Sequence, residues 1–309
     1  MTVTVVIPNY NGEEILKKNL PVLLRAVENY KNGKIDVVIV DDCSGDNSIQ
    51  VVEEFIKENK NLTLIKSENN KGFSTNVNKG VKAAAGEIVV LLNTDVIANN
   101  SFLVPLLEHF SDESVFAVGC MNESVEDGKI VLRGRGIGKW EKGFLMHRAG
   151  DLEKNNTLWI SGGSGAFRKK IWDKLNGLDE IYDPFYWEDI DISYGAQRAG
   201  FKALFEKRSV VRHEHEKGAI KSKYTPIQVK RIAYRNQFIF VWKNGDLDKL
   251  LSNFLWLPYH LFNGLKGDKA LVLGFFDALL RLPRVLNSRA NARKNFIISD
   301  KEVLSRLSS

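Results

Sequence analysis

The first hundred residues alternate short apolar runs with longer amphipathic runs, and this alternation restricts the fold more than any other feature of the sequence. Runs rich in Val, Ile and Leu predict strands at 3–7, 35–40, 62–66 and 88–92. Apolar residues at helical spacing predict the intervening helices at 13–30, 48–59 and 73–85. Strands joined by helices form right-handed βαβ units, so we expect an α/β fold with a mostly parallel central sheet and helices on both faces.

The second half of the chain is organised differently. From about 110 to 220 it has short strands and loops rich in Gly and Trp. Thr225-Pro226 predicts the start of a long apolar helix that Asn244-Gly245 ends, and further apolar helices are predicted at about 247–263 and 269–282. We therefore predict two parts, an α/β domain at 1–243 and a C-terminal helical, basic segment at 244–309.

Charge and composition restrict the class of protein. Seven basic residues against two acidic ones between Arg281 and Ser309 account for five of the six net positive charges. This excess lacks the interleaved aromatic residues of a nucleic-acid surface, so we expect no nucleic-acid partner. Two cysteines provide no disulfide framework. The first residues predict a strand rather than a signal peptide, and no run of 18 apolar residues predicts a membrane span, so a cytoplasmic protein is expected.

Polar residues follow three of the predicted strands directly. They are Asn9, the pair Asp41-Asp42 and the triplet Asn93-Thr94-Asp95. In parallel α/β sheets, ligands bind beyond the carboxyl ends of the strands. We therefore expect these side chains to meet at a binding site on one edge of the sheet.

Six sequence motifs have the order and spacing of a known family. They are VVIPNYNG, VDDCSGD, ENNKGFSTNVNKG, AAGEIVVLLNTDV, SGGSGAFRKKIW and YWEDIDISYGAQRAG. Over about 1–243 the chain resembles the family 2 inverting glycosyltransferases, most closely the rhamnosyltransferase-like branch that builds bacterial surface polysaccharides. The resemblance implies the GT-A fold and transfer of a sugar from a UDP- or dTDP-linked donor to a lipid-linked or polysaccharide acceptor.

The resemblance also implies a donor site. Asp42 would accept a hydrogen bond from the nucleotide base, Asp41 would support its loop, and Lys71 would either meet a phosphate or remain an exposed surface lysine. The full set of donor-binding residues that it implies is Pro8, Asn9, Tyr10, Asp41, Asp42, Lys71, Gly72, Asn76, Asn93, Thr94 and Asp95.

A divalent cation, Mg²⁺ or Mn²⁺, is implied as the cofactor, since carboxylate-held cations neutralise a leaving diphosphate. The family usually has Asp-x-Asp where this chain has Asn93-Thr94-Asp95, so Asp95 supplies the one carboxylate and Asn93 only a neutral oxygen. His213 and His215 share one face of a predicted strand and are further metal candidates, with His213 preferred. The alternative for the two histidines is a hydrogen-bonded polar pair.

The catalytic base is implied to lie in Trp187-Glu188-Asp189-Ile190-Asp191. Asp189 would take the proton of the acceptor hydroxyl, and Glu188 is the next candidate. Asp191 is predicted to cap a helix at 192–199. Phe185, Tyr186 and Trp187 would either form an aromatic wall for a sugar ring of the acceptor or belong to the core. Gly163 would allow close approach in a tight turn.

Two questions stay open at this level. Other classes compatible with the chain are a sugar nucleotidyltransferase, which normally needs a Gly-rich basic loop where this chain has Pro8–Gly12, and a non-catalytic nucleotide-sugar-binding scaffold, favoured by Asn93.

The C-terminal helices either pack on the catalytic domain or lie in the plane of a membrane, with the basic tail against anionic lipid. The second arrangement places the protein at the inner face of the cell membrane.

Overall fold

The computed structural model describes residues 1–126, 128–213 and 223–308. Its strands are β1 Val3–Asn9, β2 Ile35–Asp41, β3 Leu62–Lys66, β4 Ile88–Leu92, β5 Val96–Ala98, β6 Val115–Glu126, β7 Lys129–Arg133, β8 Gly136–Glu141, β9 Phe144–Ala149, β10 Ser164–Arg168 and β11 Lys202–His213. Its α-helices are α1 Glu13–Asn29, α2 Ser48–Glu58, α3 Phe73–Ala83, α4 Leu103–Glu108, α5 Lys169–Lys174, α6 Glu188–Arg198, α8 Pro226–Asn244, α9 Leu247–Lys266, α10 Lys269–Leu280, α11 Leu282–Arg293 and α12 Asp300–Ser308. Short 3₁₀ helices occur at η1 His109–Ser111 and η2 Glu180–Tyr182.

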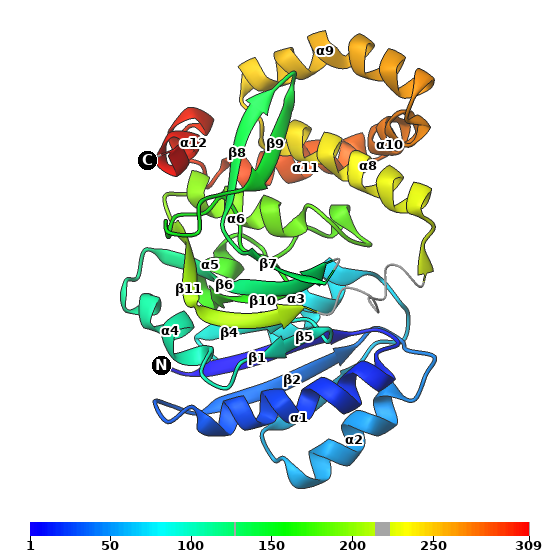
Figure 1. Cartoon of the computed structure of the whole chain (residues 1–309). Coiled ribbons are helices and arrows are strands. Elements are labelled where there is room, and N and C mark those ends of the chain that lie inside the picture. Colours follow the sequence, from blue (N-terminus) through cyan, green and yellow to red (C-terminus); the bar gives the residue numbers. More distant parts are fainter. Residues whose placement is uncertain (127, 214–222, 309) are drawn as a thin grey trace.

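A central sheet runs through the molecule in the order β3-β2-β1-β4-β10-β6-β11-β5, and β7 pairs with β6 (Figure 1). The four strands predicted in the first hundred residues are confirmed, and they are parallel to one another. Beyond β4 the sheet is mixed, because β10 runs antiparallel to both β4 and β6 while β6 and β11 are parallel. The α/β fold is therefore confirmed, with the parallel order strongest in the N-terminal half.

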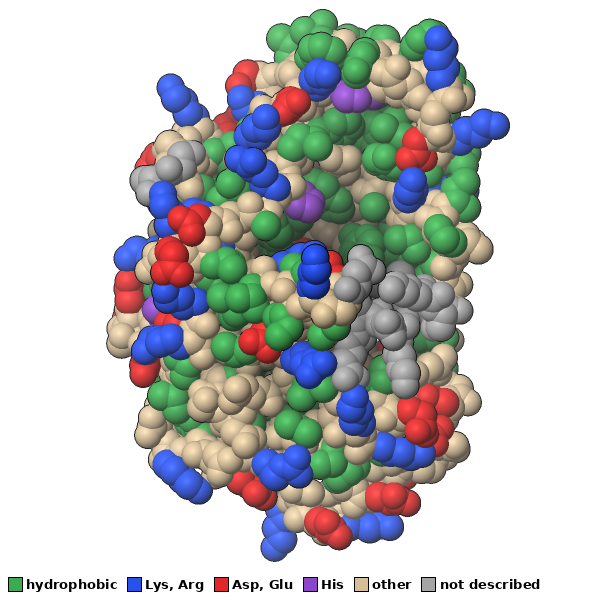
Figure 2. Space-filling view, viewed as in Figure 1, with side chains coloured by type: hydrophobic (Ala, Val, Ile, Leu, Met, Phe, Trp, Pro, Cys, Tyr) green, Lys and Arg blue, Asp and Glu red, His purple; other side chains and the backbone are tan. Residues whose placement is uncertain are grey.

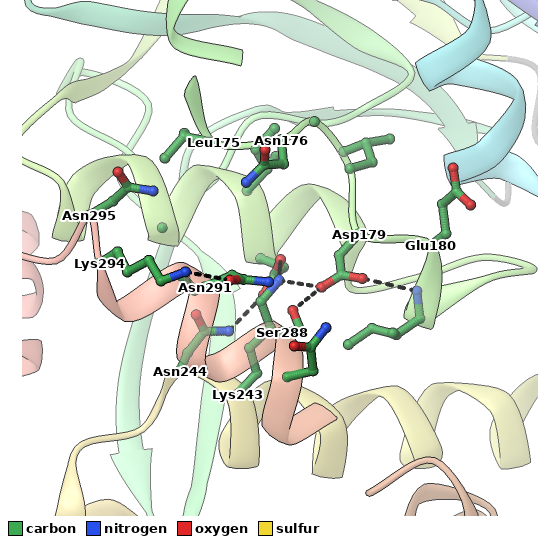
Figure 3. Close-up of a pocket in the computed structure, with 18 of the residues that line it drawn as sticks. Leu175, Asn176, Asp179, Glu180, Lys243, Asn244, Ser288, Asn291, Lys294 and Asn295 are labelled. Carbon is green, nitrogen blue, oxygen red and sulfur yellow. Dashed lines mark hydrogen bonds and ion pairs between the residues drawn. The ribbon is translucent and has the colours of Figure 1, made fainter. Parts of the chain in front are cut away.

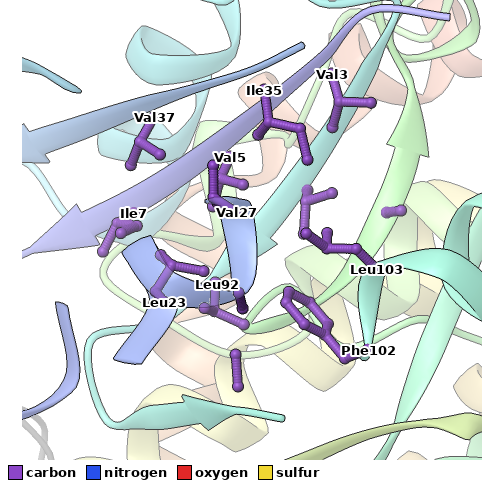
Figure 4. Close-up of a cluster of buried hydrophobic side chains, with 14 of the residues drawn as sticks. Val3, Val5, Ile7, Leu23, Val27, Ile35, Val37, Leu92, Phe102 and Leu103 are labelled. Atoms are coloured by element: carbon purple, nitrogen blue, oxygen red, sulfur yellow. The ribbon is translucent and has the colours of Figure 1, made fainter. Parts of the chain in front are cut away.

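Two apolar layers cover the two faces of this sheet. One face packs against α1, α2 and α4 through Val5, Ile7, Leu23 and Phe102, all buried (Figure 4). The opposite face packs against α3, α5 and α6. Burying both faces explains why β1, β2 and β4 are almost continuously apolar rather than alternating.

The C-terminal helices α8–α12 gather at the end of the molecule opposite α1 and α2 (Figure 1). They share a third apolar core with the β8–β9 hairpin and with α6. The predicted start of α8 is confirmed, because Thr225 and Gln228 form a reciprocal capping box with Pro226 in the first turn. Across the described ranges of the chain, we find no helical stretch with the length and hydropathy to cross a bilayer.

The basic end of the chain is folded into helices. Residues 282–293 and 300–308 are helical, as α11 and α12. Arg289 donates to the carbonyl oxygens of Trp242, Lys243 and Gly245, which the end of α8 leaves without helical partners. Arg281 donates to the carbonyl of Ile181. Part of the C-terminal charge therefore holds the helices to the rest of the protein instead of facing a partner.

Candidate functional site

A cavity of about 760 Å³ opens at the carboxyl ends of β1, β2 and β4. Nine of the eleven predicted donor-binding residues line it, namely Pro8, Asn9, Tyr10, Asp42, Gly72, Asn76, Asn93, Thr94 and Asp95. The parallel strands deliver these loops to the same edge of the sheet, as expected. Asp41 and the side chain of Lys71 are not among the lining residues.

Two adjacent carboxylates after β2 have different surroundings. Asp41 is buried and accepts hydrogen bonds from Asn9 Nδ2 at 2.7 Å and from Ser44 Oγ at 2.6 Å, so it fixes its loop as predicted. Asp42 faces the cavity and accepts from the backbone N–H groups of Lys71 and Gly72 at 3.0–3.2 Å. A carboxylate offers about four acceptor positions, so Asp42 keeps capacity for a donor group on a ligand.

Asn93 and Gly163 are in close contact next to the cavity. The backbone N–H of Asn93 donates to the carbonyl of Gly163 at 2.9 Å. A Cβ atom on Gly163 would lie 2.5 Å from Asn93 Nδ2, so glycine is needed here for close approach. The side-chain oxygen of Asn93 is buried and has no hydrogen-bond partner. Such an atom is the kind of neutral oxygen that a cation accepts as a ligand.

Asp95 and His213 lie side by side, with His213 Nε2 3.4 Å from Asp95 Oδ1. The other ring nitrogen of His213, Nδ1, lies 3.3 Å from Asn122 Oδ1, an acceptor that orients the ring. Two ligand atoms each about 2.1 Å from one ion are separated by about 3.0–3.4 Å, so this pair fits shared coordination of a cation. His215 lies outside the described residues, and within them no three His, Cys, Asp or Glu side chains cluster around one point.

The first turn of α6 carries the predicted catalytic carboxylates. Burial raises the pKa of Asp189 to about 6, although the backbone N–H groups of Ile190 and Gly162 donate to it. Glu188 is more perturbed: burial, and then the neighbouring charge of Asp189, raise its pKa well above the usual value, and its Oε2 has no partner. Both carboxyl groups therefore have raised pKa values, and a pKa of about 6 still leaves Asp189 largely ionised at neutral pH.

The Gly162–Gly163 turn joins Asn93 to Asp189. Gly162 donates its backbone N–H to Asp189 Oδ2 at 3.4 Å, and Gly163 contacts Asn93. The predicted tight turn thus lies between the polar end of β4 and the start of α6.

The aromatic residues before α6 differ from one another in exposure. Trp187 is 7% exposed and packs on Phe240 and His147 in the third core, while Phe185 is 5% exposed. Tyr186 is 42% exposed and lines the cavity. Of the three predicted wall residues, Phe185 and Tyr186 line the cavity, whereas the C-terminal helices cover Trp187.

The prediction that Asp191 caps the helix is wrong. The helix begins earlier, at Glu188, and Asp191 lies in its buried first turn. Its carboxylate accepts from Lys243 Nζ at 2.6 Å, Asn244 Nδ2 at 2.6 Å and Tyr182 Oη at 2.9 Å. Asp191 therefore binds the buried cation of Lys243 and not, as we had predicted, the free N–H groups at the start of the helix.

Residues of α8 that the sequence did not single out fix the loop before α6. Tyr186 and Trp187 have left-handed backbones, with φ of 73° and 78°, a conformation that is unfavourable for bulky side chains. Asn236 Nδ2 donates to the carbonyls of Tyr182, Phe185 and Tyr186, at 2.7, 2.9 and 2.8 Å. These contacts stabilise the strained turn that presents Tyr186 to the cavity.

Lys223 adds a cation to the cavity. Its Nζ donates to Asn70 Oδ1 at 3.1 Å and lies 4.8 Å from the centre of the Tyr10 ring. Nothing in the sequence distinguishes Lys223 from the chain's other lysines, because its place depends on how α8 docks.

Comparisons with known proteins decide the family. The sequence profile described as "Glycosyl transferase family 2" matches residues 4–175, more than half of the chain. The chain belongs to glycosyl transferase family 2. Among the relatives of this family-2 chain is the O-antigen chain rhamnosyltransferase RfbN of Salmonella typhimurium, 23% identical over 232 residues that cover 73% of the chain and 68% of the relative.

A second relative is the poly-beta-1,6-N-acetyl-D-glucosamine synthase of Staphylococcus aureus, 23% identical over 66% of the chain. The match covers 48% of that longer protein.

Solved structures show the same fold. TarS 1-349 of S. aureus in complex with UDP-GlcNAc aligns with a TM-score of 0.60 at 19% identity, over 99% of the family-2 chain and 90% of TarS. The mannosyltransferase PcManGT of Pyrobaculum calidifontis, in complex with GDP-Man and Mn²⁺, aligns with 0.56 at 17% identity, over 95% and 85% of the two chains. The predicted GT-A glycosyltransferase fold is confirmed.

Proposed function

We propose that this protein transfers a sugar, with inversion, from a UDP- or dTDP-linked donor to a lipid-linked or polysaccharide acceptor during synthesis of a cell-surface glycan. The observation that carries the proposal is the cavity at the strand ends, which gathers Asp42, Asn93 and Asp95, together with the Gly162–Gly163 turn that joins Asn93 to Asp189. The names of the relatives, a rhamnosyltransferase of O-antigen and a polysaccharide synthase, support surface-glycan synthesis.

Each side of the site has its own task. Asp42 accepts a hydrogen bond from the pyrimidine base of the donor. Asp95, His213 and the free oxygen of Asn93 would hold Mg²⁺ or Mn²⁺, and solved relatives of the fold were determined with Mn²⁺. When bound, such a cation supplies positive charge to the departing diphosphate.

Asp189 is the proposed base. The acceptor oxygen forms a bond to C1 of the sugar while its proton passes to Asp189, and the bond from C1 to the diphosphate oxygen breaks with its electrons leaving on the nucleotide. A carboxylate with a pKa of about 6 is ionised at neutral pH yet more basic than an ordinary Asp, which suits this step. Burial raises the pKa of Glu188 well above its usual value, so its carboxyl group keeps its proton more readily than an ordinary Glu.

The donor site is tested by thermal unfolding of the whole chain with UDP-, dTDP- and GDP-sugars, each with Mn²⁺ and with EDTA. We expect a shift of several degrees for one pyrimidine nucleotide with Mn²⁺, because a ligand that binds only the folded state stabilises it. EDTA should remove most of that shift, and Asp95→Asn should reduce it similarly. Asp36→Asn, whose side chain faces solvent beside Lys34, is the control and should behave as the unchanged protein.

A shift that ignored EDTA would remove Asp95 and His213 from the metal role. A metal-dependent shift without any sugar transfer would favour the non-catalytic scaffold that Asn93 suggests.

We further propose that α9 and α10 contact the membrane, at the inner face of the cell membrane where a lipid-linked acceptor lies. Hydrophobic side chains gather over α9 at the top of Figure 2. Large hydrophobic side chains at helical spacing on α9 are exposed: Leu247, Leu251, Phe254, Leu255, Tyr259, Phe262 and Leu265. Lys142 lies over the rings of Trp256 and Tyr259, at 5.5 and 5.0 Å, a combination of aromatic ring and cation that suits the headgroup region.

Co-sedimentation with phosphatidylcholine vesicles containing phosphatidylglycerol tests this contact. The unchanged protein should sediment with the vesicles, and Phe254→Glu/Leu255→Glu should remain in solution, because two charges would have to enter the apolar layer. Ile130→Glu/Leu132→Glu alters two exposed hydrophobic residues of β7 and serves as the matched control. Equal binding of both variants, or a dimer that the α9 variant alone dissociates, would contradict the membrane proposal.

A further inference from the structure

A second cavity, of about 770 Å³, lies between α11 and the segment 175–181 that leads to α6 (Figure 3). It has no residue in common with the cavity at the strand ends. Its walls are rich in one side-chain type, the primary amide: Asn176, Asn244, Asn287, Asn291 and Asn295. Asn78 also lines it, but its amide is bonded to the backbone of Leu178, and the Asn291 oxygen accepts from Lys294. The proposed donor and acceptor chemistry uses none of them.

The floor of this cavity is a closed network of charges. Lys243 Nζ lies between Asp179 Oδ2, at 2.7 Å, and Asp191 Oδ2, at 2.6 Å, and Ser288 Oγ also donates to Asp179. These three charges are paired with one another, and the other charged residues that line the cavity are Glu180, Arg284 and Lys294. Figure 3 shows Asp179, Lys243, Asn244 and Ser288 meeting at this floor.

Asn244 is the incomplete member of the floor. Its Nδ2 donates to Asp191 Oδ1 at 2.6 Å, whereas its Oδ1 has no hydrogen-bond partner although the residue is fully buried. A buried acceptor without a partner destabilises the folded state unless a donor reaches it. Asn244 lines the cavity, so a ligand hydroxyl or a water molecule that reached its Oδ1 would supply that donor.

We propose that this second cavity binds a saccharide. An amide offers two donors and an acceptor to hydroxyl groups, each of which both donates and accepts, so a wall of asparagines matches a polyhydroxylated ligand. Leu175, Ile181 and Phe296 add apolar surface for the C–H face of a sugar ring. The volume lies within the range of small-ligand sites, about 300–1,000 Å³.

The position of the cavity indicates which saccharide it serves, and this step rests on the proposed glycosyl transfer. Residues 175–181 line the second cavity, and the same segment continues to Pro184, Phe185 and Tyr186, which line the first. Asp191 on the floor is two residues beyond Asp189 in the first turn of α6. A site there holds a part of the acceptor or product glycan away from the reacting sugar.

Saturation-transfer NMR on the whole chain, without donor, tests the site with trisaccharides of rhamnose, of N-acetylglucosamine and of glucose as probes. We expect at least one to bind, and UDP with Mn²⁺ should not displace it. The double variant Asn291→Ala/Asn295→Ala should weaken binding by about fivefold or more, the loss expected for one or two hydrogen bonds. Asn100→Ala, an exposed asparagine in the turn before α4, is the matched control and should leave binding unchanged.

Three results would overturn the proposal: no probe binds at millimolar concentration, the double variant binds as the unchanged protein does, or inorganic phosphate displaces the probe and marks an anion site. The donor thermal shift does not depend on this cavity. If the trisaccharide test fails while the donor shift persists, only the second site is lost. If the donor shift fails while a trisaccharide binds in the second cavity, the proposed transfer is lost and carbohydrate binding remains.

Discussion

Replacing Asp189 with Asn is expected to lower sugar transfer by about 10²–10⁴-fold, the range associated with loss of a general base. The amide has the shape of the carboxyl group but cannot take the acceptor proton. The donor cavity does not include Asp189, so the metal-dependent thermal shift with the nucleotide sugar should be nearly unchanged. Initial rates of transfer, measured beside that shift, check both parts. Turnover at the normal rate would show that Asp189 is not the base.

The pH dependence of the unchanged enzyme should report the ionisation of Asp189. Asp189 must be deprotonated to act, so kcat/KM should rise with pH up to about 6 and level off above it. The value of kcat/KM rises rather than falls with pH because only the ionised fraction of Asp189 works as a base.

The substitution Asp189→Asn is also expected to stabilise the folded protein at alkaline pH. The pKa of Asp189 is about 6 when folded and about 3.8 when unfolded, so the folded state binds more protons between these values and loses stability as pH rises through them. Above pH 6 the resulting loss of free energy of unfolding is on the order of 3 kcal/mol. Urea denaturation should therefore find Asp189→Asn more stable than the unchanged protein at pH 8, with the difference disappearing near pH 4. Asp36→Asn should show no such pH dependence.

Local patterns were sufficient for the N-terminal half of the fold. The strand at 88–92 and the polar triplet after it could be read directly, because a buried parallel strand leaves a continuous apolar run and its loop must be polar. Both Asp41 and Asp42 were placed by the same rule, and their different surroundings in the structure agree with the supporting and cavity-facing positions predicted for them. Their roles toward a donor remain predictions.

The errors arose where distant segments meet. Asp191 follows a pattern typical of a helix cap, but Lys243, 52 residues away, reaches it and buries it as an ion pair. Trp187 appeared suited to a sugar platform, yet Phe240 of α8 covers it. Charge and aromatic content are visible in a sequence, whereas the partner that buries them is not.

Replacing Lys243 with Met is expected to destabilise the protein by about 3–5 kcal/mol at pH 7, the cost typical of removing one partner from a buried ion pair. Lys243 lies within hydrogen-bond distance of both Asp179 and Asp191. Burial disfavours its charge, but the two carboxylates outweigh that effect and raise its pKa. Without it, the buried carboxylate of Asp191 and the partly buried carboxylate of Asp179 would lose their shared cation, and urea denaturation of the whole chain measures the loss.

The control for this prediction is Lys202→Met, which removes an exposed ion pair with Asp112 and should cost about 0–1 kcal/mol. Adding Asp191→Asn to Lys243→Met should recover part of the lost stability, because one unpaired charge is removed with the cation already absent. Lowering the pH toward 4 should recover part of it too, since both carboxylates then take up protons. If Lys243→Met cost no more than Lys202→Met, the network would not stabilise the fold. A large cost would mean that Lys243 of α8 holds the first turn of α6 in place, and with it Asp189.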